Sequence, residues 1–358
     1  MHESLIRLSR LLLQSRGTQP HAALAGDPDW LEPGSGEFED LVKLAQLNHV
    51  VVRSLEVLLN STWEQDCAQA DAAQRALAAE RARTATALGF LHRVCSTFQE
   101  CGLNVIVIKS LDHWPDLGSD LDLYTDARVD DVSRLMMERF SARIAARSWG
   151  DRLAQKWNFY LPGLPEAIEV HIGRLGQTGE QDAIARGLVK RACTVQAGGY
   201  AFPVPSTADR IMISTLQRIY RHFYFRLCDI VDTAALADAR ALDYDTLRGL
   251  ATTAGIWEGV ATYLEIVSDY VRSYRGFGLV LPHFVTTAAR FGGDELFYAR
   301  GFLRVPVMPH SAYLYGAQLA GTLGRRELKN GARLSLLPWL ATAAAVKQKF
   351  TGNDKGIW

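Results

Sequence analysis

Two aspartates stand one residue apart in an otherwise apolar stretch, and this feature most constrains how the chain can fold. The stretch reads DLDLY at residues 120–124. If it is a strand, Asp120 and Asp122 share one face, because successive side chains of a strand point to opposite sides. Carboxylates on one face repel each other, so we expect either that solvent surrounds them or that a cation lies between them.

A small α/β unit is predicted around these aspartates. The β-branched run VIVI at 105–108 is typical of a strand buried on both faces. The sequence AIEVH at 167–171 alternates in the same way as DLDLY, which places Glu169 and His171 on one face of a later strand. A helix is expected between these strands, at about 128–140.

Long helices are predicted on both sides of this unit, because apolar residues recur there with a helical period. The predicted ranges are 38–59, 65–100, 206–236, 243–254, 256–275, 283–291 and 310–323. At 358 residues the chain is long enough for two or three domains. We therefore predict an α+β fold in three parts: an N-terminal helical region (1–100), a core with a small mixed β-sheet (101–205) and a C-terminal helical region (206–358).

The charge balance and the apolar segments limit the classes of partner. The chain carries 39 basic and 39 acidic residues, so no overall field recruits a nucleic acid or an anionic membrane, although a local basic patch remains possible. The sequence shows neither a secretory signal nor an apolar segment of roughly 18 residues, so we expect a cytoplasmic protein with no transmembrane segment. For residues 325–350 we expect a closing helix that packs on its own domain; the alternatives are a helix on a membrane surface and a helix that packs on a partner.

The cysteines form no CxxC pair. Their scatter indicates reduced thiols rather than a disulfide framework or a zinc site, in agreement with a cytoplasmic location. The five are Cys67, Cys95, Cys101, Cys193 and Cys228.

Three acidic residues from the two alternating strands are candidates for a metal site. If the strands are neighbours in the sheet, the carboxylates of Asp120, Asp122 and Glu169 converge. A cluster of oxygen ligands suits one or two Mg²⁺ ions, which prefer a few carboxylates together with substrate phosphates. The alternative is a pair of solvent-facing strand positions, since an isolated Asp-x-Asp is a weak motif.

Polar residues after the first strand are candidates for phosphate binding. Lys109 and Ser110 end that strand, where a short turn offers backbone N–H groups, a hydroxyl and an ammonium group. His171 is a candidate for contact with metal or substrate, although a single histidine is more often a hydrogen-bonded structural residue.

A second set of polar residues has the spacing of one stripe along the predicted helix 206–236. The set is Arg218, His222, Arg226 and Asp229. If the stripe faces the acids, the basic residues can hold a triphosphate while Asp229 orients a cation. The alternative is a solvated helix face with an internal ion pair.

In their order along the chain, these residues resemble the polymerase-β-like nucleotidyltransferase superfamily, and more closely its branch of uncharacterised nucleotidyltransferases. The resemblance covers about residues 38 to 275. It rests on Ile108-Lys109-Ser110, Asp120-Leu121-Asp122, Glu169-Val170-His171, His222 and Arg226-Leu227-Cys228-Asp229. Three departures from the family pattern are Ser110 in place of glycine, Glu169 in place of the commoner aspartate, and the absence of an arginine shortly before the first acid.

The resemblance implies a nucleotidyltransferase core and a Mg²⁺-dependent reaction. An NMP would move from an NTP to a hydroxyl acceptor, with release of pyrophosphate. Asp120, Asp122 and Glu169 would hold the metal, and Glu169 would also assist deprotonation of the acceptor. Nucleotide binding would fall to the basic and hydroxyl residues Lys109, Ser110, Arg218, His222 and Arg226.

The acceptor expected from the neutral net charge is a small molecule. Two alternatives remain open. One is a toxin-like nucleotidyltransferase that acts on tRNA or protein. The other is a non-catalytic nucleotide-binding or scaffold protein with the same fold.

Overall fold

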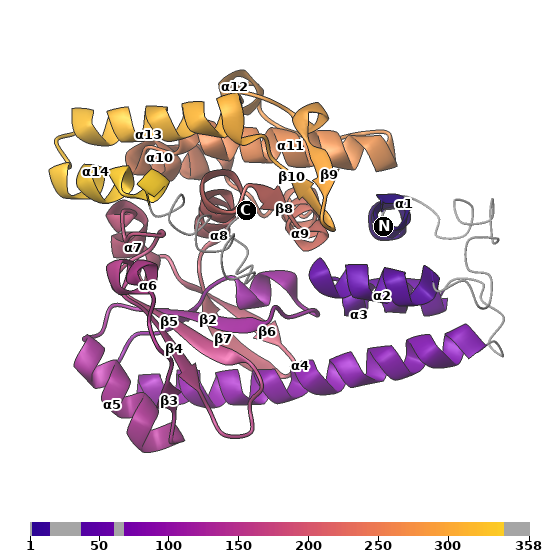
Figure 1. Ribbon diagram of the computed structural model, residues 1–358, viewed down its shortest axis with the longest axis horizontal. Helices are drawn as coiled ribbons and strands as arrows, with labels where there is room; N and C mark the ends of the chain where they lie inside the picture. Colours follow the sequence, from indigo (N-terminus) through magenta and orange to yellow (C-terminus); the bar gives the residue numbers. More distant parts are fainter. Residues whose placement is uncertain (1, 15–36, 61–67, 340–358) are drawn as a thin grey trace.

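The computed structural model describes residues 2–14, 37–60 and 68–339, and it has a mixed α+β architecture (Figure 1). A five-stranded sheet lies in the lower half in this view. Its order is β1-β2-β5-β4-β3. The strands are β1 (Ile106–Val107), β2 (Asp120–Thr125), β3 (Arg143–Ile144), β4 (Lys156–Tyr160) and β5 (Ala167–Ile172).

The two acid-bearing strands are direct neighbours. β2 and β5 pair in parallel, whereas the other pairs in the sheet are antiparallel, so the sheet is mixed as predicted. In this register Asp122 lies opposite Glu169. The predicted alternation is confirmed, because Leu121 and Leu123 are fully buried on the other face.

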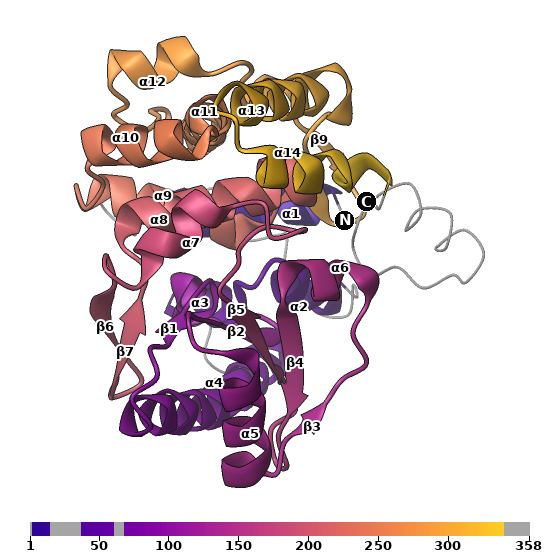
Figure 2. The same ribbon diagram turned by 90° about the vertical axis from the view of Figure 1, so that its left-hand side faces the viewer.

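Two helices cover that apolar face of the sheet. They are α4 (Ala68–Glu100) and α5 (Val129–Phe140), and both views place them on the side of the sheet away from the C-terminal helices (Figures 1 and 2). Leu91 and Phe98 of α4 share a buried core with Leu121 and Leu123 of β2. The alternating leucines therefore direct the carboxylates of β2 to the opposite side, toward the C-terminal helices.

The first and last parts of the chain share a second core. Leu8, Leu44 and Leu55 from the N-terminal helices are buried together with Val260 of the C-terminal part. The N-terminal helices are α1 (His2–Gln14), α2 (Glu37–Leu47) and α3 (Val51–Asn60). The C-terminal helices are α8 (Thr207–Thr215), α9 (Leu227–Asp238), α10 (Tyr244–Ala254), α11 (Trp257–Arg275), α12 (His283–Ala288), α13 (Ala312–Gly324) and α14 (Leu328–Ser335).

Several elements were not predicted from the sequence. They are α1, two further short helices and five short strands. The helices are α6 (Trp149–Ala154) and α7 (Asp182–Leu188). The strands are β6 (Cys193–Ala197), β7 (Tyr200–Val204), β8 (Tyr224–Phe225), β9 (Phe297–Ala299) and β10 (Phe302–Arg304). These strands form one hairpin, β6–β7, and a small sheet in the order β8-β10-β9.

The prediction of one helix over 38–59 is wrong, because the chain breaks between α2 and α3. His49 adopts a left-handed conformation (φ 52°), and the Asn48 side-chain amide donates to the carbonyl oxygens of Leu44 and Gly301. The Asn48 side-chain oxygen also accepts from the N–H of Leu227 at 3.0 Å. These long-range bonds stabilise a turn that the helical period of the sequence does not show.

The prediction of one helix over 206–236 is also wrong. Helix α8 passes into a π-helical turn, Leu216–Arg221, and Phe223 then takes a left-handed conformation (φ 54°). The next two residues pair with β10 as strand β8 before α9 begins. Tertiary strand pairing overrides the local helical period here, as it often does for aromatic residues.

The other predicted helices are present with small shifts at their ends: α4, α5, α10, α11, α12 and α13. Of the closing segment 325–350, the described part forms α14, which packs on α13. Tyr315 of α13 donates from its hydroxyl to the carbonyl oxygen of Leu334 at 2.9 Å. Residues 340–350 and 65–67, with Cys67, lie outside the described residues. Among the described helices, none combines the length and apolar character needed to cross a membrane.

A buried ionic network joins the N-terminal helices to the rest of the fold. Arg53 of α3 donates from Nε to Asp116 at 2.8 Å and from Nη1 to Asp232 of α9 at 2.5 Å. Asp116 also accepts from the N–H of Val52 at 2.6 Å, which caps the first turn of α3. One guanidinium thus neutralises two carboxylates from different parts of the chain.

We predict that Arg53→Met lowers the free energy of unfolding by about 3 kcal/mol or more, because two buried carboxylates lose their counter-ion. The matched control is Arg81→Met, which removes an exposed pair with Glu56 and should change stability by about 1 kcal/mol or less. Chemical denaturation of both variants measures the difference. Equal effects of the two substitutions would contradict a stabilising role for the network.

Candidate active site

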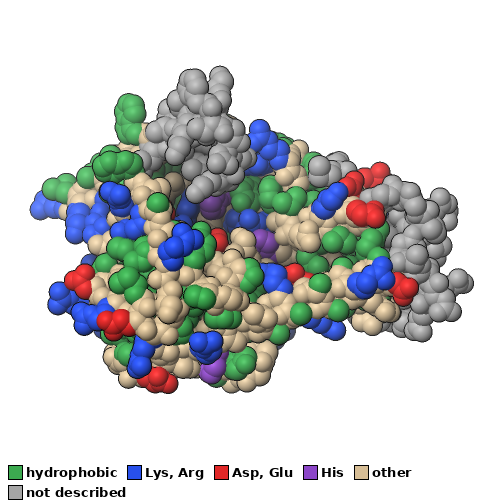
Figure 3. Space-filling view, turned by 60° about the horizontal axis from the view of Figure 1, so that its bottom comes forward, with side chains coloured by type: hydrophobic (Ala, Val, Ile, Leu, Met, Phe, Trp, Pro, Cys, Tyr) green, Lys and Arg blue, Asp and Glu red, His purple; other side chains and the backbone are tan. Residues whose placement is uncertain are grey.

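A cavity of about 390 Å³ lies between the acid-bearing face of the sheet and the C-terminal helices. Figure 3 shows a furrow of this kind, with basic and histidine side chains inside it. All eight residues that the sequence predicted as catalytic or nucleotide-binding line the cavity. They are Lys109, Ser110, Asp120, Asp122, Glu169, Arg218, His222 and Arg226.

The carboxylates form one wall of this cavity. Asp122 and Glu169 face each other across the β2–β5 pair, and His171 Nε2 lies 2.9 Å from Glu169 Oε1 and 3.7 Å from Asp122 Oδ1. The ligand atoms of these three residues all lie within 4.8 Å of one another. Asp120 stands two residues before Asp122 and is exposed to the cavity.

Two lysines neutralise this wall. The Lys109 ammonium pairs with Asp122 and lies 3.7 Å from Glu169, while Lys156 of β4 lies 2.7 Å from Glu169. Lys109 has φ 64° and ψ −52°, the strained conformation of a γ-turn with positive φ, in which the N–H of Ser110 donates to the carbonyl oxygen of Ile108 at 2.6 Å. Such strain is often retained at functional sites. The cation that lies between Asp122 and Glu169 in this structure is thus the Lys109 ammonium group.

The Ser110 hydroxyl is already engaged in the fold. Its Oγ accepts from the N–H of Asp122 at 2.7 Å, and the residue is only 3% exposed. Ser110 therefore ties the turn after β1 to the acid-bearing strand, although it also reaches the cavity surface.

The opposite wall of the cavity is basic. Arg218 of the π-helical turn pairs with Asp229 of α9 at 2.7 Å, and both side chains are 3% exposed. Asp229 also accepts from the N–H of Arg226 at 2.8 Å. Asp229 thus positions Arg218 and Arg226. From the sequence it was expected to orient a bound metal cation.

Arg226 and Arg221 carry the available charge on this wall. Neither guanidinium has an ion-pair partner among the described residues, and both line the cavity. Arg226 lies over the rings of Tyr224 and Phe302, at 5.7 and 5.9 Å from their centroids. The two aromatic rings hold this guanidinium toward the cavity without neutralising it.

Arg218, His222 and Arg226 do not form the helical stripe that their spacing predicted. Arg218 lies in the π-helical turn. His222 directly follows the last residue of that turn, and Arg226 directly precedes the first residue of α9. They meet in one cavity because the chain reverses through β8. The tertiary fold, rather than one helix face, therefore brings these three residues together.

The acids differ in their protonation. Burial, together with the charges of Asp122 and Glu169, raises the pKa of Asp120 to about 6. Burial would also raise the pKa of Glu169, but Lys109, the hydrogen bond with His171 and Lys156 outweigh it and hold that pKa well below its usual range. Near neutral pH, Glu169 is a firmly ionised carboxylate, and Asp120 is the weaker acid.

The donor set fits Mg²⁺ if the Lys109 ammonium moves aside. Asp122 and Glu169 provide carboxylate oxygens from adjacent strands, and Asp120 provides a third at the cavity surface. Mg²⁺ is commonly held by one or two carboxylates, with waters and substrate phosphates completing its shell. His171 suits the orientation of Glu169 better than direct ligation of this ion.

Several cavity residues were missed by sequence reasoning. Lys156 belongs to β4, whose antiparallel pairing with β5 was not predicted. Arg221 lay within the predicted helix 206–236, off the stripe. His49 and His113 lie in turns far from the motif residues. Only the alternation in KWNFY, which contains Lys156, was a signal in the sequence.

Comparison of the chain with known proteins found no matching family model and no matching curated protein. The geometry and charge of the cavity are therefore the basis for assigning a function.

We predict that Lys109→Met lowers the free energy of unfolding by about 2 kcal/mol without Mg²⁺, because Asp122 loses its partner. Added Mg²⁺ should raise the Tm of this variant more than that of the wild type, since the ammonium no longer competes for the carboxylates. Thermal unfolding with and without Mg²⁺ provides the measurement. Lys43→Met, at an exposed pair with Asp40, is the control, and an equal Mg²⁺ effect on all three proteins would contradict this site.

We also predict that Asp120→Asn stabilises the metal-free protein at pH 7 by up to about 1 kcal/mol, a value reduced for the exposure of this side chain. The folded protein binds the Asp120 proton more tightly than the unfolded chain does. Its stability therefore falls as the pH rises from about 4 through about 6. Denaturation at pH 4 and pH 7 tests this. The gain in stability should appear only at pH 7. A variant that is destabilised at pH 7 would contradict repulsion of Asp120 by Asp122 and Glu169.

Proposed function

We propose that this protein is a Mg²⁺-dependent nucleotidyltransferase with a polymerase-β-like core, which transfers an NMP from an NTP to a hydroxyl acceptor. The observation that carries the proposal is the division of one cavity into two walls. Three carboxylates from adjacent parallel strands stand on one side, and Arg221 and Arg226 stand on the other, with no carboxylate partner in the described part of the chain. This arrangement suits a triphosphate that is bound through cations on one side and guanidinium groups on the other.

The residues of the chain have separate roles in this reaction. The acceptor oxygen attacks the α-phosphorus, the bond to the β-phosphate oxygen breaks, and pyrophosphate leaves. Arg226 and Arg221 bind the phosphate oxygens and stabilise charge on the leaving group. Bound Mg²⁺ would neutralise phosphate charge and support alignment of the reactants.

The ion pairs of the acids favour a different proton acceptor from the one expected from the sequence. Glu169 is held ionised by two lysines and has a low affinity for a proton. Asp120 faces the cavity and has no ion-pair partner among the described residues, so its carboxylate is available to accept a proton. We therefore assign deprotonation of the acceptor hydroxyl to Asp120, and the holding of Mg²⁺ chiefly to Asp122 and Glu169.

The size of the cavity supports binding of a small molecule such as a nucleotide. Its volume of about 390 Å³ falls within the range of small-ligand pockets, roughly 300 to 1,000 Å³. Its lining contains five basic residues, Lys109, Lys156, Arg218, Arg221 and Arg226, against three acidic ones. This local excess supports binding of a nucleotide.

A second candidate function is a non-catalytic nucleotide-binding protein, and one observation favours it. The Lys109 ammonium pairs with Asp122 in the place that a catalytic cation would require. In such a protein Lys109 would remain on the acids, and nucleotide would bind without Mg²⁺. The two functions therefore differ in the metal dependence of nucleotide binding.

Calorimetric titration of each NTP, with and without Mg²⁺, tests the proposal. We expect Mg²⁺-dependent binding that Asp122→Asn abolishes and that Arg226→Gln weakens about 10- to 100-fold, because each removes a charge that contacts phosphate. Arg134→Gln, at an exposed position on α5 paired with Asp131, should leave binding unchanged. Nucleotide binding that is independent of Mg²⁺ and of Asp122 would favour the non-catalytic function, and no binding to the folded wild type would contradict both.

A further inference from the structure

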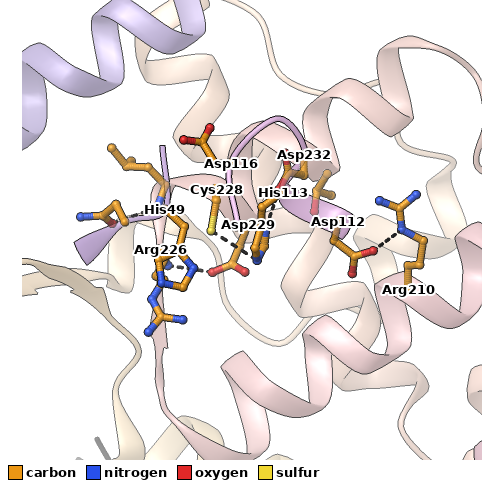
Figure 4. Close-up of polar contacts among 12 residues, drawn as sticks. His49, Asp112, His113, Asp116, Arg210, Arg226, Cys228, Asp229 and Asp232 are labelled. Carbon is orange, nitrogen blue, oxygen red and sulfur yellow. Dashed lines mark hydrogen bonds and ion pairs between the residues drawn. The ribbon is translucent and has the colours of Figure 1, made fainter. Parts of the chain in front are cut away.

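Three side chains from distant parts of the chain meet beside the candidate active site. His49 lies in the turn between α2 and α3, His113 ends the short 3-10 helix after β1, and Cys228 lies in the first turn of α9. One nitrogen of each histidine and the cysteine sulfur all lie within 4.8 Å of one another. Figure 4 shows these residues together with the carboxylates around them.

Hydrogen bonding orients the His113 ring toward the sulfur. His113 Nδ1 lies 2.6 Å from Asp232 Oδ2 (Figure 4). Asp232 also accepts from Nη1 of Arg53. With Nδ1–H donating to this carboxylate, Nε2 turns its lone pair toward Cys228 Sγ at 3.6 Å. A carboxylate behind a histidine in this way is the usual outer partner of a metal-binding imidazole.

His49 provides a second, independent observation. Its Nδ1 is buried, and no hydrogen-bond partner for it exists in the described chain. A buried polar atom without a partner normally costs about 1 to 3 kcal/mol. The turn that carries this ring is fixed nevertheless, because the side-chain oxygen of Asn48 accepts from the N–H of Leu227 and its carbonyl oxygen accepts from the N–H of Cys228. An imidazole with an unsatisfied nitrogen, placed beside a thiol and a second imidazole, points to a missing ligand.

We propose that His49, His113 and Cys228 bind a Zn²⁺ ion. Imidazole nitrogen and thiolate sulfur are the ligands that zinc prefers. Tetrahedral zinc, with a Zn–S bond of about 2.3 Å and Zn–N bonds of about 2.0 Å, places sulfur and nitrogen about 3.5 Å apart. The observed distance from Cys228 Sγ to His113 Nε2 is 3.6 Å.

The fourth position on this zinc opens toward the cavity. His49 and His113 line the cavity, whereas Cys228 is fully buried behind them. Three protein ligands and one accessible position are typical of zinc sites that hold a water or a substrate atom. The zinc would therefore present a bound water, or an oxygen of a bound molecule, to the same cavity that contains the acids.

The surrounding charges can accept the ion. Arg226 and Arg218 lie close enough to His49 to oppose a cation. The thiolate, Asp229 and Asp232 supply negative charge, and the two carboxylates are already paired with Arg218 and Arg53. A zinc–thiolate pair adds a single net positive charge to this balanced group, and the solvent-accessible cavity screens it.

The same contacts also resemble a Cys-His-Asp nucleophilic triad, but the burial of the sulfur opposes that reading. Cys228 is 0% exposed and does not reach the cavity surface. A nucleophile must contact its substrate, which a sulfur buried away from the cavity does not do. A metal needs only the sulfur and nitrogen lone pairs, which already converge.

Cobalt substitution in the full-length protein tests the zinc site. Chelator-treated protein should bind one Co²⁺ with a thiolate-to-metal charge-transfer band, which Zn²⁺ then displaces. Cys228→Ser should remove that band, and Cys228→Ser and His49→Gln should each weaken Zn²⁺ binding by more than about 100-fold. A metal at Asp122 and Glu169 would give no thiolate band, so the two sites are distinguishable.

Two controls make the outcome decisive. Cys95→Ser changes a buried thiol in the other core and should leave the band unchanged. His49→Gln gives up no hydrogen bond at Nδ1, so it should fold even if Cys228→Ser does not, and circular dichroism checks both. Absence of the band in folded wild-type protein, or a band that survives in folded Cys228→Ser, would overturn the proposal.

Discussion

The parallel pairing of β2 with β5 is the interaction on which the candidate site depends. It places Asp122 opposite Glu169 at the distance of neighbouring strands, where two like charges repel. The fold compensates with cations from both sides, since Lys109 approaches from the turn after β1 and Lys156 from β4. The acids therefore remain ionised and close together, as a site for a divalent cation requires, and Lys109 is the group that such an ion would displace.

The cavity also owes its position to the way the two cores divide the chain. One core lies between the sheet and α4 with α5, and the other unites the N-terminal helices with the C-terminal ones. Polar residues gather where the two cores meet. Arg53 spans this boundary by pairing with Asp116 and Asp232, so one buried cation connects the N-terminal helices, the core and α9. The proposed zinc ligands come from the same three parts of the chain, and the ion would strengthen the same junction.

Sequence reasoning predicted individual elements better than their interruptions. The alternation of DLDLY and AIEVH indicated which residues face the cavity, and the structure confirms that these strands are neighbours. The helical period did not show the turn at Asn48 and His49 or the break at Phe223. Both depend on partners far along the chain, namely Gly301 and Leu227 for the first, and β10 for the second. A local pattern contains no information about such partners.

The sequence by itself determined the mixed α+β class, the faces of the two acid-bearing strands and the residue types that line the cavity. These follow from the periods of apolar residues, because burial of a face is decided within one element. Tertiary structure alone decided that Lys109 and Lys156 neutralise the acids, that Asp229 holds Arg218, and that His49, His113 and Cys228 meet. These contacts join residues more than ten positions apart, and long-range packing, rather than local conformational preference, brings such residues together.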